Sequence, residues 1–126
     1  MPQITVRYRH DSMLDDPEII DRLKVVLAEV CARILDTTSW PVTAESFGFT
    51  INRVVPPSSI TEDVIIELPL HAIPERVKAS ELHAATIAER VATILLSYGA
   101  PWGTTVGIRL SYGFVEWTRR EIRFVE

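Results

Sequence analysis

Hydrophobic and polar residues alternate over residues 3–9, where Ile4, Val6 and Tyr8 share one face of a predicted strand. A period of two is typical of a strand that buries one face. The continuous apolar run at 64–68 instead favours a strand buried on both faces, near the centre of a sheet. Strands are also expected at 47–51 and on towards residue 55, at 105–110 and, as a short fifth, at 121–125.

Two other segments carry apolar residues at helical spacing. The first is predicted to begin with Asp16 as N-cap and Pro17 at the first helical position, and to end near Asp36. The second is predicted to begin between residues 74 and 80. It should stop before Gly99, because glycine readily adopts the left-handed conformation that follows many helices.

The elements therefore run β-α-β and then β-α-β, which predicts one domain over residues 1–126 with two similar halves of about 1–60 and 61–126. Crossover connections place both helices on one face of a four-stranded mixed sheet, an α+β fold. The other face is expected to be apolar and open, and so to be buried against another subunit. An unrelated ferredoxin-like domain has the same order of elements, and the pattern leaves that alternative open.

The composition narrows the class of protein. The chain has 126 residues, of which 47% are hydrophobic and 24% charged, as in a globular domain that needs no membrane. Its net charge of -4 argues against nucleic acid as a partner. The early charges of Arg7 and Arg9 argue against a secretory signal peptide. A single cysteine, Cys31, rules out an internal disulfide, is expected to be buried, and fits a cytoplasmic protein.

Pro2 follows the initiator methionine, which is normally removed before a small residue. Removal of Met1 would turn Pro2 into a free secondary amine, a base that no internal residue can supply. The pyrrolidine ring fixes φ, so the backbone would aim this base. If Met1 is retained, Pro2 is an ordinary amide that only begins a strand.

Pro2 combined with the duplicated β-α-β order resembles the tautomerase superfamily, which includes 4-oxalocrotonate tautomerase and macrophage migration inhibitory factor. The pattern is closest to malonate semialdehyde decarboxylase and cis-3-chloroacrylic acid dehalogenase. Arg76-Val77-Lys78 matches an Arg-x-Arg pair of the decarboxylase, and a gap-free stretch continues from there to Glu116-Trp117. The resemblance implies a cofactor-free homotrimer, with sites between subunits, that acts on a small carboxylate-bearing substrate.

The resemblance also assigns roles to residues. Pro2 would be the catalytic acid or base, Arg76 the clamp on the substrate carboxylate, and Glu116 a modulator or water activator. An apolar site would lower the pKa of the Pro2 amine and give a base, whereas a nearby carboxylate would raise that pKa and give an acid. The expected substrate-binding residues are Lys78, which replaces the second arginine of the family, and the apolar walls Phe114 and Trp117.

Simpler interpretations of these residues stay open. Arg76 and Lys78 also fit two solvated charges in the first turn of a helix, although the helix dipole slightly disfavours cations there. Glu116 also fits an exposed loop glutamate. The sequence assigns no role to Glu45, His71, Arg7, Arg53 or Arg109, and it predicts only that Arg109 faces away from its neighbours Ile108 and Leu110.

The expected activity is keto–enol tautomerisation of a small 2-keto or enol carboxylate. A decarboxylase-like or 3-haloacrylate dehalogenase-like hydration lyase is the alternative that the Arg76, Lys78 and Glu116 matches favour. A non-catalytic oligomeric binding module of the same fold is the third possibility, because fold alone does not determine function.

Overall fold

The structure is a computed structural model, and it describes residues 3–37 and 41–122 of the chain. Pro2, the residue predicted to be the acid or base, lies outside the described residues. The strands are β1 (Gln3–Arg9), β2 (Gly48–Val54), β3 (Val64–Pro69), β4 (Thr105–Ser111) and β5 (Val115–Glu121). The helices are α1 (Pro17–Leu35), α2 (Pro74–Lys78) and α3 (Ser80–Ser97), with short 3-10 turns η1 (Met13–Asp15) and η2 (Ala44–Ser46).

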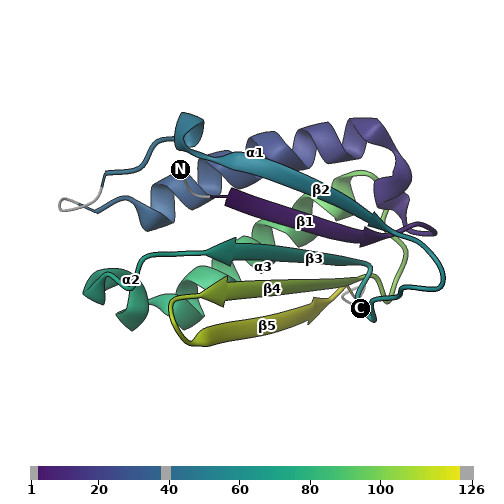
Figure 1. The fold of residues 1–126 in the computed structure, drawn as a ribbon. Helices are drawn as coiled ribbons and strands as arrows, with labels where there is room; N and C mark the ends of the chain where they lie inside the picture. Colours follow the sequence, from purple (N-terminus) through teal and green to yellow (C-terminus); the bar gives the residue numbers. More distant parts are fainter. Residues whose placement is uncertain (1–2, 38–40, 123–126) are drawn as a thin grey trace.

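All five strands of the described residues form one mixed sheet with the order β2-β1-β3-β4-β5 (Figure 1). β1 is parallel to β2, and β3 is parallel to β4, while β1 pairs with β3 and β4 with β5 in antiparallel fashion. Each long helix thus connects two adjacent parallel strands. In a ferredoxin-like domain another strand separates the two strands of each β-α-β unit, so the sheet order excludes that alternative.

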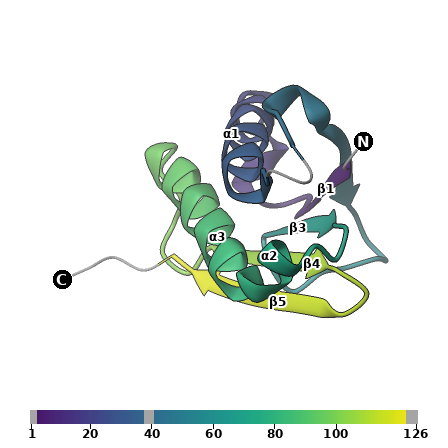
Figure 2. The same ribbon diagram turned by 90° about the vertical axis from the view of Figure 1, so that its left-hand side faces the viewer.

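Both α1 and α3 lie on one face of the curved sheet, as expected (Figure 2). The core lies between the helices and this face, since Ile4, Val6 and Tyr8 of β1 are buried there and alternate with partly exposed residues. Other large and fully buried side chains are Leu23, Leu27, Ile66, Ile87, Leu95, Ile108 and Leu110.

The opposite face of the sheet differs from the expectation of an apolar surface. It carries Arg7, Glu67 and Arg109 in its middle strands, and Arg109 faces away from its buried neighbours in β4, as predicted. Apolar side chains on this face are interspersed with charges rather than continuous. This face therefore carries both charged and apolar residues. In the single chain it is open to solvent, because both crossover helices lie on the other face.

The start of α1 agrees in detail with the start predicted from the sequence. The Asp16 carboxylate accepts a hydrogen bond of 3.0 Å from the backbone N–H of Glu18, and Pro17 occupies the first helical position. The last helical residue is Leu35. The buried thiol of Cys31 lies on the inner side of this helix, and burial raises its pKa to about 12, which makes it an inert thiol.

The second helical segment is not one helix but two. α2 spans five residues from Pro74 and ends at Lys78, and α3 begins after Ala79, whose φ of -102° and ψ of 13° interrupt the helix. Arg76 and Lys78 consequently lie in the last turn of α2, not in the first turn of a long helix. α2 is only about one turn long and α3 begins two residues after Lys78, so the dipole of α2 gives these cations little stabilisation. Gly99 follows α3 with a φ of +82°, as predicted.

The fifth strand also departs from the prediction of 121–125. It spans Val115–Glu121, and the predicted strand shares with it only Glu121. β5 is an edge strand on which the apolar Val115 and Trp117 are exposed beside polar residues, so it lacks the buried alternation that marks an inner strand. Over the described residues the sheet has five strands rather than the four expected. Glu116 and Trp117 accordingly lie on a strand and not in a loop.

One end of the sheet brings several segments together. β1 and β5 begin there, β3 and β4 end there, and α2 lies beside them (Figure 1). Gln3, the first described residue, is thus at the same end of the molecule as α2. No helix of the described ranges has the length and apolar character needed to cross a membrane.

Candidate functional site

Five polar side chains gather between α2, α3 and the end of β4. This Arg76 cluster consists of Arg76, Ser80, His83, Tyr112 and Glu116. Two of its members, Arg76 and Glu116, were predicted site residues. Buried polar groups in proteins are nearly always hydrogen-bonded, so unsatisfied atoms in such a cluster point to a missing partner.

The guanidinium of Arg76 is fixed against the end of α1. Only 2% of the residue is exposed, and its Nε donates a hydrogen bond of 2.9 Å to the carbonyl oxygen of Leu35. Leu35 is the last residue of α1, where carbonyl groups lack a partner within the helix and carry the negative end of the helix dipole. This bond orients the guanidinium and satisfies one of those carbonyl groups.

The charge of Arg76 is not neutralised by any carboxylate of the described residues. Nη2 is buried and has no hydrogen-bond partner, and no carboxylate of a described residue forms an ion pair with Arg76. Burial lowers its pKa, while electrostatic interactions with Tyr112, Asp36 and Glu75 act in the opposite direction. Because a buried unpaired charge is costly, this guanidinium is suited to bind an anion.

Tyr112 and His83 face the same region with unsatisfied polar atoms. The Tyr112 hydroxyl and His83 Nδ1 are both buried without a hydrogen-bond partner among the residues that the structure describes. Burial raises the pKa of Tyr112 to about 12, so its hydroxyl stays protonated and can donate. Burial, and then the charge of Arg76, lower the pKa of His83 below its ordinary value, so its ring is neutral at neutral pH.

Glu116 forms the border of the cluster on β5. Ser80 Oγ at the start of α3 donates a hydrogen bond of 2.9 Å to its carboxylate, and this carboxylate contributes to the high pKa of Tyr112. Phe114, in the β4–β5 turn, stacks on the Tyr112 ring with 5.5 Å between ring centroids. The structure therefore brings Phe114 to the edge of the cluster.

Two predicted binding residues lie apart from the cluster. The side chain of Lys78 is exposed at the end of α2. Trp117 projects from the face of β5 opposite to Glu116, because neighbouring residues of a strand point to opposite sides of the sheet. Trp117 thus does not line the cluster that contains Arg76.

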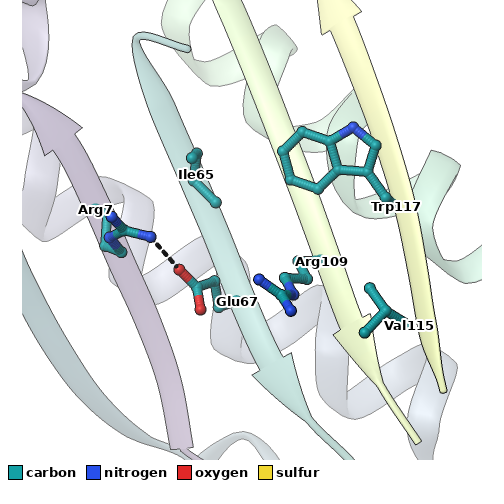
Figure 3. A pocket seen from close by; sticks show the side chains of 6 residues that line it. All are labelled: Arg7, Ile65, Glu67, Arg109, Val115 and Trp117. Atoms are coloured by element: carbon teal, nitrogen blue, oxygen red, sulfur yellow. Dashed lines mark hydrogen bonds and ion pairs between the residues drawn. The ribbon is translucent and has the colours of Figure 1, made fainter. Parts of the chain in front are cut away.

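Trp117 instead lines a depression of ≈ 340 Å³ on the open face of the sheet, here called the sheet hollow (Figure 3). Arg7 donates a hydrogen bond of 2.9 Å to the Glu67 carboxylate in this hollow. The residues that line it are Arg7, Ile65, Glu67, Arg109, Val115 and Trp117.

The remaining residues to which the sequence assigned no role lie outside both places. Glu45 is exposed on η2, and His71 is exposed before α2. Arg53 forms two hydrogen bonds with the Asp15 carboxylate, of 2.6 and 3.1 Å. No three metal-ligating side chains are grouped in the part of the chain that the structure describes.

Sequence reasoning missed Ser80, His83 and Tyr112. A signal for each was present: Tyr112 continues the buried alternation of Ile108 and Leu110, and Ser80 and His83 precede the apolar stripe of α3 at helical spacing. Polar residues at positions predicted to face a core indicate a buried polar site.

Comparison with solved structures finds a similar fold. The fold is similar to the crystal structure of a macrophage migration inhibitory factor-like protein from Entamoeba histolytica, with a TM-score of 0.53 and 8% sequence identity over 88% of this chain and 87% of that chain. No protein-family model matches the sequence, and no curated protein matches it. The similarity confirms the predicted type of α+β fold.

Proposed function

We propose that this protein is a cofactor-free isomerase of the tautomerase type, with Pro2 as its acid or base after removal of Met1. Its substrate would be a small 2-keto or enol carboxylate. The observation that carries the proposal is the buried guanidinium of Arg76, which lacks an anionic partner among the described residues and belongs to α2, at the same end of the sheet as the start of β1. The similarity of the fold to a macrophage migration inhibitory factor-like protein supports it as well.

In this proposal Arg76 and Tyr112 bind the substrate carboxylate. Arg76 supplies the charge through Nη2, and the protonated Tyr112 hydroxyl donates a second hydrogen bond. The bond from Nε to Leu35 holds the guanidinium in place before the substrate arrives, which lowers the entropic cost of binding. The carboxylate would neutralise the buried cation.

Pro2 would transfer the proton. In ketonisation of an enol, the neutral amine takes the hydroxyl proton, the enol electron pair shifts towards carbon, and the protonated amine returns a proton to that carbon. The reaction leaves the protein unchanged and needs no cofactor. General acid–base catalysis of this kind contributes about 10²–10⁴-fold to a rate.

A hydration-linked lyase is the second candidate, and the position of Glu116 favours it. Its carboxylate, held by Ser80, lies beside Tyr112 in the Arg76 cluster, where it could activate water for addition to a three-carbon acid. Turnover of 3-haloacrylate or malonate semialdehyde would support this reaction. Turnover of phenylpyruvate with no turnover of 3-haloacrylate or malonate semialdehyde would reject the lyase.

The decisive experiment combines intact mass with activity. We expect the purified protein to lack Met1, to interconvert the enol and keto forms of phenylpyruvate, and to lose this activity in Pro2→Ala. Pro101→Ala, a change of the same type at an exposed position after α3, should retain it. Arg76→Gln should raise KM by about tenfold or more, since a hydrogen bond to a charged group is worth about 1.5–3 kcal/mol.

A retained Met1, or activity that Pro2→Ala leaves unchanged, would contradict the proposal. Retained Met1 together with no turnover of any of the three substrates would instead favour a non-catalytic binding module.

A further inference from the structure

The sheet hollow contains a second cation that lacks a partner among the described residues. No hydrogen bond or ion pair joins Arg109 to another residue of the described ranges, and its residue is exposed on the open face. Glu67 is its direct neighbour across β3 and β4, yet the Glu67 carboxylate pairs with Arg7 at 2.9 Å (Figure 3). The one carboxylate that lines the hollow is therefore bound to Arg7, and the charge of Arg109 is not neutralised.

The charge in the hollow selects the kind of ligand. Two arginines and one glutamate give a net charge of one positive unit, which matches a monoanion. A planar guanidinium binds a carboxylate with two parallel hydrogen bonds. Because the rest of the lining includes Ile65, Val115 and Trp117, the ligand should carry its carboxylate on an apolar body.

The indole of Trp117 is already placed to receive such a body. The indole lies over Gly107 of β4. A Cβ atom added to this glycine would be 2.5 Å from Cη2 and 3.1 Å from Cζ2 of the indole. Only glycine leaves room for the ring at this position. Arg109 and Trp117 face each other across β4 and β5, so the cation and the aromatic surface adjoin.

We infer that the sheet hollow is a binding site for a small aromatic monocarboxylate. The carboxylate binds Arg109, and the ring packs against Trp117 and the apolar side chains beside it. The volume of ≈ 340 Å³ falls at the lower end of the range of about 300–1,000 Å³ found for small-molecule sites. This site is separate from the Arg76 cluster, since the two lie on opposite faces of the sheet, and it does not depend on the proposed reaction.

Benzoate is the probe that tests this site, by isothermal titration calorimetry on the full chain. We expect saturable binding of benzoate, and weaker binding of both benzamide, which lacks the charge, and acetate, which lacks the ring. Arg109→Gln should weaken benzoate binding about tenfold, as expected for loss of a charged hydrogen-bonding partner. Arg119→Gln is the matched control, because Arg119 lies on the same face but outside the hollow and pairs with Glu62 at 3.5 Å.

Gly107→Ala supplies a second and independent variant. It keeps Arg109 but displaces the indole, so it should weaken benzoate while it leaves the weak binding of acetate unchanged. Circular dichroism and thermal unfolding verify that each variant is folded.

Three results would overturn the inference: no saturable benzoate binding to the wild type, binding unchanged in Arg109→Gln, or binding lost in Arg76→Gln and kept in Arg109→Gln. The last result would assign benzoate to the Arg76 cluster, and so would support the proposed function while it rejects this second site. A face covered by another copy of the chain would give the first result.

Discussion

Single unsatisfied atoms are the most specific features of this protein. Arg76 Nη2, His83 Nδ1 and the Tyr112 hydroxyl are buried without partners in the described part of the chain, and each such group costs about 1–3 kcal/mol. Proteins retain such groups where function requires them, since stability and activity often compete at binding sites. Substitutions in the Arg76 cluster should therefore affect stability and activity differently.

Tyr112→Phe makes this separation measurable. The substitution removes a buried hydroxyl that has no partner and keeps the ring that stacks on Phe114. We expect the free energy of unfolding in urea to stay constant or to rise by about 1 kcal/mol. If the hydroxyl binds the substrate carboxylate, KM for phenylpyruvate should rise in the same variant. A clear loss of stability would show instead that the hydroxyl has a structural partner.

His83 provides a prediction about pH. Its pKa in the folded protein lies below the ordinary value of 6.5, because of burial and then the charge of Arg76. Between these two pKa values the unfolded chain binds a proton that the folded chain does not, so stability falls as the pH drops from about 6.5 through the folded pKa. A titration of the His83 ring by NMR should give the low pKa directly.

Two variants check the cause of that pH dependence. In Arg76→Gln the pKa of His83 should rise towards 6.5, since one of the two causes is removed. In His83→Gln this part of the pH dependence of stability should disappear. A His83 pKa above 6.5 in the wild type would contradict the described packing.

At the scale of elements, local sequence signals were sufficient for β1, α1 and the central β3. The apolar alternation of β1, the continuous apolar run of β3 and the Asp16–Pro17 start of α1 each depend on neighbouring residues alone. β5 was misplaced because Ile122, which is buried just beyond its end, gives a stronger apolar signal than the polar edge strand itself.

The candidate site was predicted only in part for a related reason. The resemblance selected Arg76 and Glu116, which do lie in one cluster. It also grouped Trp117 with Glu116, although the alternation of β5 sends the two side chains to opposite faces. The bond from Arg76 to Leu35 joins residues from distant parts of the sequence, and no local pattern encodes such a contact.

The start of α1 offers the clearest test of an element predicted from sequence. Asp16→Ala removes the carboxylate that accepts from the N–H of Glu18, and it should lower the free energy of unfolding by about 1 kcal/mol. Asp21→Ala, at an exposed position inside the same helix, should cost nothing, because alanine favours a helix more than aspartate does. Equal losses in both variants would argue against a capping role.

For the whole molecule, the edges of the sheet raise the question of assembly. β2 and β5 are the edge strands of the described sheet, and β5 exposes 50% of Val115 and 43% of Trp117. Exposed edge strands with apolar side chains are templates for pairing with another chain. The resemblance to the tautomerase superfamily implies a homotrimer, and pairing through such edges is one way to build it.

We therefore expect light scattering to give the mass of three copies of the 14.2 kDa chain. A monomer at all concentrations would contradict both the trimer and a site shared between subunits.

Benzoate binding would also indicate which surface forms the contacts between subunits. A trimer that binds benzoate through Arg109 must keep the sheet hollow accessible, so its subunits would meet through the edges of the sheet. A trimer that excludes benzoate would place the interface on the open face itself, with the unpaired charge of Arg109 satisfied by a neighbouring chain.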